Sequence, residues 1–540
     1  KLTNWVGAKL TGNVTAGAGD DTVENKGTLT GNVALGDGLN ALSNIADASL
    51  TGDVSGGIGN DSFSNAGTFY GNVDLGGGTN SITNLIDGVF NSRSTINLGA
   101  GNTFTNSGIF NPGGLGTVQT TTVIGNFVQA VDGRLLIDIK DSGTTLAADQ
   151  IAVTGSATLA GLVVPNVVSI RDAEKNEYLI VTTTAGATNN GLDVAPKTIT
   201  VRDTVAYDFE ADVRDNKSVY LTATQQAVEK IVEAASEAPG AGSQENLASL
   251  GKTLNAVEDQ TGETTLKPVL QALRVESSTP EAAAKALNRL TPQQQSGQTN
   301  STNTSGNAFS NAMLSCASRD QPYKFTKEDT CYYGKFTARK LERDATTTSA
   351  GHEERGYEVM GGVQVNLGDN LRGGVAFGYE DTSGDTFSTT QRLGKSDGDR
   401  FHGGLVLKNQ WGPVNAYLNL AGSYGSYDHT RFVNMGGFTN ALGDQDVISG
   451  LIKLRLSYLN EMGSWYVKPM VDVGATYIDL DGYSETGAGA FNLKVASHSD
   501  WLFSVSPAVE IGGQITDGSG TLYRPYIRGG VTLFDKDDMT

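Results

Sequence analysis

Hydrophobic and polar positions recur in a fixed pattern over residues 10–110 of the chain. The motif reads LTGNV at 10–14 and 29–33, LTGDV at 50–54, FYGNV at 69–73 and, more weakly, STINL at 94–98. The copies begin 19, 21, 19 and 25 residues apart, which is typical of a solenoid whose coils stack on one another. About 20 residues accommodate three short strands and three turns. The pattern therefore predicts a parallel β-helix, for which we assume the right-handed form.

Each repeat also carries glycines and ends a strand on asparagine. Glycines such as Gly17, Gly19, Gly36 and Gly38 supply the positive φ angles that a tight corner requires. The asparagines occupy equivalent positions, so their side chains can hydrogen-bond to one another along the stack. The predicted ladder consists of Asn25, Asn44, Asn65, Asn84 and Asn106.

The pattern changes twice after residue 110. Residues 111–224 lose the period but keep the β-branched, alternating character of strands, so we expect larger coils that cap the solenoid. Apolar residues at i, i+3 and i+4 then predict helices over 225–237, 246–259, 266–276 and 280–290. Thr279 is the expected N-cap of the last helix, with Pro280 in its first turn. The polar tract 292–306 predicts a flexible linker, and 307–318 a short helix of small residues.

After Cys331 the period becomes two. Nine strands are expected, at 332–343, 355–367, 371–381, 398–409, 413–427, 448–459, 464–479, 501–515 and 521–534. The connections at Gly368, Gln410, Asn460 and Thr516 are short, whereas the others, such as 381–398, are long and polar. This asymmetry is typical of outer-membrane barrels, with an aliphatic face toward lipid and a charged face toward a wet lumen. A soluble sandwich is the competing interpretation. Since bacterial barrels normally close with an even number of strands, we expect the closing strands to be missing.

Composition narrows the class of protein. The 540 residues carry a net charge of −20, which argues against a nucleic-acid partner because phosphates require a basic surface. No run of about 18 apolar residues predicts a membrane helix. Lys1 opens directly into the repeats, so we expect the sequence to begin after any signal peptide, within a longer protein. Cys316 and Cys331 are 15 residues apart and are predicted to form a disulfide, with two free thiols as the alternative.

Few motifs suggest chemistry. The segment GGIGNDSFS at 56–64 fits a calcium-binding repeat, and AGAGDDTVE at 16–24 comes close, which makes Asp21 and Asp61 candidate calcium ligands. The other coils have asparagine there, so plain structural turns are the competing interpretation. GDVSGG at 52–57 has the letters of a serine-protease loop, but no histidine precedes His352. We find no other metal, phosphate-loop or hydrolase motif, and expect neither a cofactor nor an enzymatic activity.

The order of these parts resembles the autotransporter family of type V secretion. NPGG at 111–114, GRLLIDI at 133–139 and ADQIAVTGSATLAGLVV at 148–164 are similar to its autochaperone-type segment, and residues 363–380 to its early barrel hairpin. The resemblance implies passenger repeats at 1–110, an autochaperone-like cap at 111–224, a helical junction and linker at 225–303, a pore helix and connector at 304–328, and an incomplete barrel at 329–540 with about nine of twelve strands.

The resemblance also implies a function. The barrel would sit in the outer membrane and export the passenger, which is displayed on the cell surface or secreted. Implied partners are outer-membrane lipids, the barrel-assembly machinery, periplasmic chaperones and a surface or host ligand of the passenger. Two alternatives remain: the solenoid is itself an adhesin, or it presents a hydrolase domain that lies upstream of this sequence.

Some autotransporters release the passenger when an asparagine in the pore cyclises onto its own carbonyl. By this resemblance Asn311, which precedes Ala312, is the candidate. Proton transfer would come from lumenal groups such as Lys335, Arg339, Arg455 and Asp472. A helix of small residues that merely fits a narrow lumen is the competing interpretation.

Overall fold

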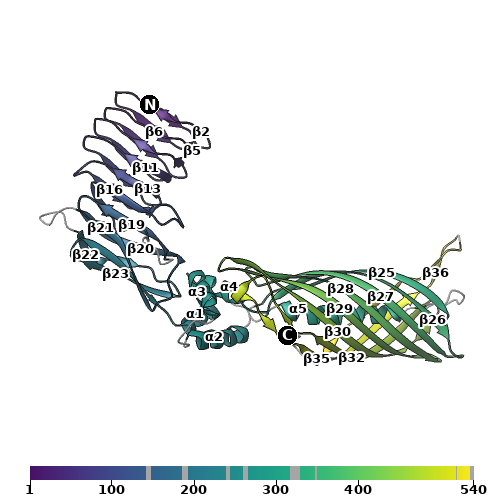
Figure 1. The fold of residues 1–540 in the computed structure, drawn as a ribbon. Coiled ribbons are helices and arrows are strands. Elements are labelled where there is room, and N and C mark those ends of the chain that lie inside the picture. The colour runs from purple at the N-terminus through teal and green to yellow at the C-terminus, as the bar shows by residue number, and fades with distance from the viewer. Residues whose placement is uncertain are drawn as a thin grey trace. The chain divides into compact units, whose positions relative to one another are not determined.

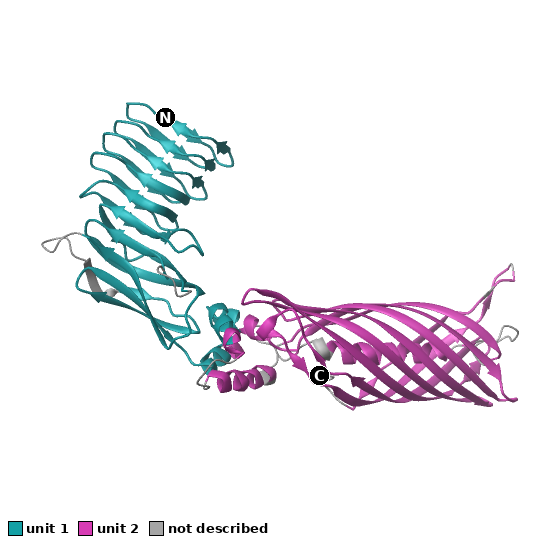
Figure 2. Cartoon of the chain, in the orientation of Figure 1, with its two compact units in different colours: residues 1–234, 270–283 teal, residues 235–269, 284–540 magenta. Residues whose placement is uncertain are grey.

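The computed structural model describes residues 1–141, 147–184, 192–238, 244–258, 265–292, 294–314, 316, 329–346, 349–518 and 520–535. These residues form two compact units, one of residues 1–234 and 270–283 and the other of 235–269 and 284–540 (Figure 2). Strands build most of both units.

Short strands that stack in parallel build the N-terminal unit (Figure 1). Each strand pairs with the equivalent strand one coil later, as β4 does with β7 and β7 with β10. This register confirms the predicted parallel stack. The strands of the repeats are β1 (Leu2–Asn4), β2 (Lys9–Thr11), β3 (Val14–Thr15), β4 (Thr22–Asn25), β5 (Thr28–Thr30), β6 (Val33–Ala34), β7 (Ala41–Asn44), β8 (Ser49–Thr51), β9 (Val54–Ser55), β10 (Ser62–Asn65), β11 (Thr68–Asp74), β12 (Ser81–Asn84), β13 (Val89–Asn97), β14 (Thr103–Asn106) and β15 (Ile109–Pro112).

Buried asparagines run along the inside of the stack. Asn44 Nδ2 donates to Asn65 Oδ1 at 2.8 Å, and Asn65 Nδ2 donates to Asn84 Oδ1 at 2.7 Å. The second hydrogen of each amide is used as well, since Asn44 Nδ2 also donates to Thr68 O at 3.1 Å. The ladder runs further than the five predicted rungs, because Asn4 precedes it and Gln129 follows it. The asparagine amides are fully paired, whereas Nε2 of the terminal Gln129 is buried without a partner among the described residues. The paired amides tie each coil to the next.

Phenylalanine rings fill the centre of the later coils. Neighbouring ring centroids lie 4.6–6.1 Å apart in tilted or edge-to-face pairs. Such pairs contribute about 0.5–1.5 kcal/mol each beyond the area that they bury. The buried rings are Phe63, Phe69, Phe90, Phe104, Phe110 and Phe127.

Strands of four to thirteen residues complete the N-terminal unit after residue 112. They are β16 (Thr120–Ile124), β17 (Asn126–Gln129), β18 (Arg134–Lys140), β19 (Gln150–Val153), β20 (Ala157–Ser169), β21 (Lys175–Thr183), β22 (Leu192–Val201), β23 (Tyr207–Arg214) and β24 (Ser218–Gln225). The parallel stack ends where β24 pairs antiparallel with both β21 and β23. A capping role for this segment stays a prediction.

Four helices follow, where the apolar spacing predicts them. They are α1 (Val228–Glu237), α2 (Gln244–Glu258), α3 (Lys267–Glu276) and α4 (Pro280–Asn288). The expected cap of α4 is confirmed, because Thr279 Oγ1 accepts a hydrogen bond of 3.2 Å from the Ala282 amide. Among the helices that the structure describes, none combines the length and the hydropathy needed to cross a membrane.

The predicted flexible linker at 292–306 is wrong. A single helix, α5 (Gln294–Met313), covers most of that tract and the first part of the expected pore helix, and begins ten residues before residue 304. The error has a physical cause: Ser, Thr, Asn and Gln favour a linker only where water is their partner, and here protein groups take that place. The expected connector falls largely on residues 315 and 317–328, which lie outside the described part of the chain.

A curled antiparallel sheet forms the C-terminal unit (Figure 1). Its nine consecutive strands confirm the predicted number: β25 (Cys331–Arg343), β26 (Gly351–Asn366), β27 (Leu371–Phe387), β28 (Arg392–Trp411), β29 (Val414–Met435), β30 (Phe438–Tyr458), β32 (Trp465–Leu480), β35 (His498–Gly513) and β38 (Tyr526–Gly530). Shorter elements accompany them: β31 (Asn460–Met462), β33 (Tyr483–Ser484), η1 (Gly489–Phe491), β34 (Lys494–Val495), β36 (Ile515–Thr516), β37 (Leu522–Tyr523) and β39 (Leu533–Phe534).

Three of the four short connections are tight turns, as predicted, but the fourth, from β35 to β38, spans residues 514–525 and carries the small β36–β37 hairpin. The expected long loops are mostly strand. β27 continues to Phe387 and β28 begins at Arg392, so only 388–391 remain of the loop expected at 381–398. Polar side chains pair across this extension, as when Ser383 Oγ donates to Asp397 Oδ1 at 2.6 Å. The hydrophobic alternation stops where the apolar face stops, whereas backbone pairing continues. The alternation therefore places the strand ends too early.

Removing one rung of the ladder should weaken the solenoid. Asn65→Ala leaves an Asn44 amide hydrogen and the Asn84 carbonyl oxygen without their partners, so we expect the free energy of unfolding to fall by about 2–4 kcal/mol. The measurement is the urea midpoint of the solenoid, followed by far-UV circular dichroism. Asn13→Ala is the matched control, because Asn13 Oδ1 caps the Asn32 amide at the exposed surface. Equal midpoints for the two variants would contradict a stabilising ladder.

Solenoid stability should also depend on pH through Asp149. This carboxyl is fully buried and accepts hydrogen bonds from the amides of Gln119 and Asp138 at 2.7 and 2.8 Å. Burial, opposed by these two bonds and aided by the charge of Asp138, raises its pKa to about 8. Because the folded pKa lies above the unfolded one, the contribution is present at acid pH and is lost as the pH rises toward 8.

We therefore expect the urea midpoint to fall between pH 5 and pH 9. Asp149→Asn should lower the midpoint at pH 5, since an amide cannot accept from both backbone groups, and should flatten the pH profile. Asp132→Asn, at an exposed turn, is the control and should keep the wild-type slope. An Asp149→Asn profile as steep as the wild type would assign the pH dependence to other groups.

Candidate functional site

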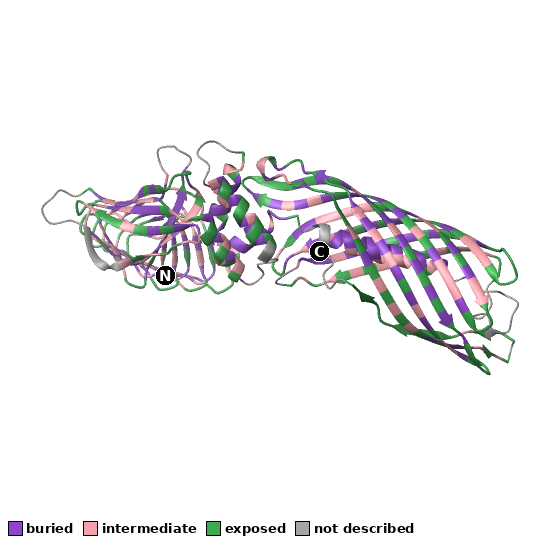
Figure 3. Ribbon diagram, turned by 90° about the horizontal axis from the view of Figure 1, so that it is seen from below, coloured by how far each residue is buried: buried purple, intermediate pink, exposed green. Residues whose placement is uncertain are grey.

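The two faces of the curled sheet differ in chemistry. Along most strands, more and less exposed residues alternate (Figure 3), whereas the last strand, β38, is exposed throughout. The outward positions carry large apolar side chains such as Phe336, Phe377, Leu405 and Val473, all of them at least half exposed. The inward positions carry charged and polar side chains, among them Arg400, Lys408 and Asn419. A water-filled interior behind an apolar exterior is the arrangement of a barrel that spans a bilayer.

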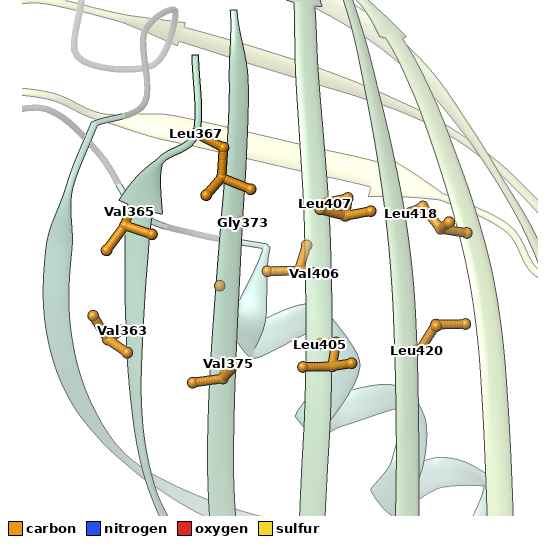
Figure 4. Close-up of a pocket in the computed structure, with 11 residues that line it drawn as sticks. Val363, Val365, Leu367, Gly373, Val375, Leu405, Val406, Leu407, Leu418 and Leu420 are labelled. Atoms are coloured by element: carbon orange, nitrogen blue, oxygen red, sulfur yellow. The ribbon is translucent and has the colours of Figure 1, made fainter.

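A shallow apolar groove interrupts the outer face across β26–β29. It has a volume of about 380 Å³ and lies around Gly373, where a side chain is missing between those of Leu367 and Leu407 (Figure 4). The groove opens on the aliphatic face, so lipid chains are its natural neighbours.

The helix α5 lies against the inward face of the sheet (Figure 1). Its side chains are polar over most of its length, and many of them are buried, including Gln298, Thr302 and Ser305. A helix that is polar all round has no apolar face to pack. It is stable here only if the surrounding strands supply hydrogen-bond partners.

Charged side chains of the sheet supply those partners. Ser301 Oγ donates to Glu354 Oε1 at 2.8 Å, and Ser305 Oγ, one helical turn later, donates to Glu380. Arg400 Nη2 donates to Thr302 Oγ1 at 2.9 Å. These contacts hold the middle of α5 to three adjacent strands.

The lumenal charges also pair with one another. Arg339 Nη2 lies 2.9 Å from Glu354 Oε1 and 2.6 Å from Glu380 Oε1. Arg400 Nη1 lies 3.5 Å from Glu380 Oε2. A buried charge without a partner costs several kcal/mol. Because these charges are paired, the lumen can bury charged groups that also hydrogen-bond to α5.

Apolar contacts and small residues seat the end of α5. The Phe309 ring stacks on His402, with centroids 5.0 Å apart. A Cβ on Gly404 would lie 2.5 Å from Met313 Cε and 3.0 Å from a Phe309 ring carbon, so glycine alone leaves room for these side chains. Asn419 Nδ2 donates to Ser310 O at 2.7 Å. The sequence does show a glycine, Gly404, at this inward position, but the alternation along the strand does not reveal that it makes room for side chains of α5.

The structure brings Asn311 together with most of the expected lumenal groups. Arg455 Nη2 donates to Asn311 Oδ1 at 3.1 Å and is itself paired with Asp472 at 2.6 Å. Lys335 Nζ donates to Ala312 O, on the far side of the bond in question. Arg339, by contrast, pairs with Glu354 and Glu380, which lie beside the middle of α5. Beside Asn311 lies a polar pocket of about 490 Å³.

The two cysteines lie at the same end of the lumen. Cys316 and Cys331 are joined as a disulfide with Cα atoms 6.1 Å apart. This bond ties the chain that follows α5 to the first residue of β25.

The candidate calcium ligands occupy the same corner of the solenoid, in coils that are not adjacent. Asp21 and Asp61 are two coils apart, with Asn40 between them. Asp21 Oδ2 accepts from the Gly17 amide at 3.1 Å, whereas Asn40 Nδ2 donates to Gly36 O at 3.1 Å. In the coil of Asp21, the corner loop therefore presents a backbone N–H group to the carboxylate. In the coil of Asn40, it presents a backbone carbonyl to the side-chain amide. No described group of His, Cys, Asp and Glu residues is arranged to hold a metal ion.

Residues 333–538 match the family model of the autotransporter beta-domain. Among solved structures, the chain is similar to the translocator domain of the autotransporter NalP from Neisseria meningitidis, at 12% identity over 39% of this chain and 70% of that one, with a TM-score of 0.31. It is also similar to the beta domain of the Bordetella autotransporter BrkA, at 15% identity over 38% and 78%, with a TM-score of 0.29. No curated protein sequence matches the chain.

The family match agrees with the apolar outer face, the charged lumen and the helix held inside it. Proteins of this family insert in the outer membrane and display a passenger at the cell surface. Residues 333–538 of this chain thus match the autotransporter beta-domain family, and this match supports a role in moving a passenger across the outer membrane.

Proposed function

We propose that this chain carries its own β-helical solenoid, residues 1–224, through the barrel and displays it as a surface stalk. The observation that supports this most is the course of α5 through the lumen. Near one end, the chain is tied to the start of β25 by Cys316 and Cys331. Near the other, Arg289 Nε donates to Gln391 Oε1 at 3.1 Å, at the tip of the extended β27–β28 hairpin.

Between residues 289 and 316, the chain therefore runs from the end of the lumen with the extended β27–β28 hairpin to the end with short turns. Short turns face the periplasm in outer-membrane barrels, and longer extensions face outward. The chain leaves the lumen on the outer side at residue 289. The residues that precede it have therefore crossed the outer membrane. Export of the preceding residues, followed by retention of α5 in the lumen, accounts for the contacts at both ends of α5.

Thiol labelling of intact cells tests this topology. The natural cysteines are paired, so single cysteines can be introduced at the exposed residues Thr389 and Gly518. We expect a membrane-impermeant maleimide to label Thr389→Cys in intact cells, and Gly518→Cys only after the outer membrane is permeabilised. Labelling of Gly518→Cys alone would reverse the orientation, and with it the direction of export.

We further propose that the stalk is released by cleavage after Asn311. Asn311 Nδ2 loses a proton and attacks the Asn311 carbonyl carbon, the bond to Ala312 breaks, and the Ala312 nitrogen takes up a proton as the new amine. The products are a C-terminal succinimide and a free N-terminus. The bond from Arg455 to Asn311 Oδ1 favours this step, because it draws electron density from the side-chain amide and makes its nitrogen easier to deprotonate.

Asn311→Asp tests cleavage, because it keeps the size of the side chain and removes the nucleophilic nitrogen. We expect the wild-type barrel fragment to begin at Ala312 and the variant to remain full-length on a denaturing gel of outer membranes. Asn307→Asp is the matched control, since Asn307 lies one turn earlier and its Nδ2 donates to Asn303 O at 2.9 Å. An uncut wild type, or a variant cut as well as the control, would leave Asn311 a helical residue that fills the lumen.

A further inference from the structure

The turns that follow the ladder residues alternate between two lengths. Four residues separate Asn4, Asn44, Asn84 and Gln129 from the next strand, but only two separate Asn25, Asn65 and Asn106 from theirs. Backbone hydrogen bonds close the long turns, from Ala8 N to Trp5 O at 2.9 Å and from Gly88 N to Leu85 O at 2.9 Å, for example. The structural repeat is therefore two coils.

The short turns lie close beneath the long ones. A Cβ added to Gly27 would lie 2.2 Å from Ala8 O, and one added to Gly67 would lie 2.3 Å from Ala48 O. Glycine is needed there because the backbone of the preceding long turn occupies the space. The long turns consequently protrude along one edge of the stack, and the short turns are recessed between them.

Each protruding turn begins with two apolar residues. These residues form what we call the apolar ridge: Trp5, Val6, Ile45, Ala46, Leu85, Ile86, Ala130 and Val131. Several are largely exposed, with 67% of Trp5, 77% of Val6 and 70% of Val131 accessible. Because neighbouring coils are about 4.8 Å apart, the turns of the ridge recur about every 9.6 Å.

Acidic side chains accompany the ridge. The third residue of the last three long turns is Asp47, Asp87 or Asp132, each exposed. Residues 1–110 carry nine acidic and four basic side chains, a net charge of −5. Three basic residues flank this edge: Lys26, which is paired with Glu24 at 2.9 Å and lies 5.6 Å from the centre of the Trp5 ring, and Lys9 and Arg134, which follow the first and last long turns. Because the repeats as a whole carry net negative charge, a second copy of the solenoid would be repelled, whereas a basic partner would be attracted.

We propose that the apolar ridge is a docking surface for a cationic amphipathic α-helix. In such a helix, residues i and i+7 lie on one face about 10.5 Å apart along the axis. This step differs from the spacing of the ridge by only about 1 Å. One apolar position of each heptad meets each protruding turn, and flanking Lys or Arg side chains meet Asp47, Asp87 and Asp132.

Binding can be measured on the full chain in nanodiscs of zwitterionic lipid, so the test does not depend on export. The probe is a fluorescein-labelled 22-residue peptide with leucines at heptad spacing and lysines between them, followed by fluorescence anisotropy. A peptide of the same composition in scrambled order is the first control. We expect the scrambled peptide to bind at least tenfold more weakly.

Two sets of substitutions that preserve charge locate the site. The ridge variant carries Trp5→Ser, Val6→Ser, Ile86→Ser and Val131→Ser, and the control carries Leu39→Ser, Ile58→Ser and Leu115→Ser at other exposed apolar positions of the solenoid. All seven side chains are exposed, and unchanged thermal unfolding verifies that both variants fold. We expect at least tenfold weaker binding for the ridge variant and wild-type affinity for the control.

Equal affinity of the ridge variant and the wild type overturns the proposal. So does equal binding of the scrambled peptide, which would reduce the interaction to net charge. Self-association of the protein without peptide, lost in the ridge variant, would also overturn it, because the ridge would then receive a second copy. A shift in affinity confined to the ridge and to the ordered peptide supports it.

Discussion

Pairing of charge around Glu380 is the constraint on which the C-terminal unit depends. This buried carboxylate receives Arg339 and the hydroxyl of Ser305, and lies within 3.5 Å of Arg400. Each of these groups would be costly to bury alone. Together they allow a narrow lumen to hold a polar helix. On the topology proposed above, these contacts also hold the chain in the lumen until the bond after Asn311 is cut, so this hold rests on electrostatic complementarity and hydrogen bonding.

The sequence was most informative where one residue does the same work in every repeat. Asn25, Asn44 and Asn65 end equivalent strands, and a buried amide in a parallel stack has a natural partner in the coils above and below. The nine strands of the sheet were equally readable, because their inward and outward residues alternate in polarity. In both cases the pattern and the packing have the same period.

Prediction failed where a residue's partner lies far away in the chain. Ser301 and Ser305 belong to a tract with the composition of a linker, and their partners in the helix, Glu354 and Glu380, lie more than 50 residues further along the chain. The candidate site was found in part: Arg455, Asp472 and Lys335 do lie near Asn311, because inward positions can be counted along a strand. Arg339 does not, since counting gives the side of the sheet and not the height along the lumen. The alternation of turn lengths was present in the spacings of 19 and 21 residues, but its consequence for exposure required the glycine contacts.

Those glycine contacts also restrict how such a stalk can change its length during evolution. A short turn that follows a long one requires glycine, because a side chain at Gly27 or Gly67 would meet the carbonyl of Ala8 or Ala48. Duplicating or deleting a single coil would place two long turns or two short turns side by side and break the Asp and Asn order of the opposite corner. Gene duplications of this array are therefore tolerated in units of two coils, about 40 codons. The reach of the stalk then grows in increments of about 10 Å.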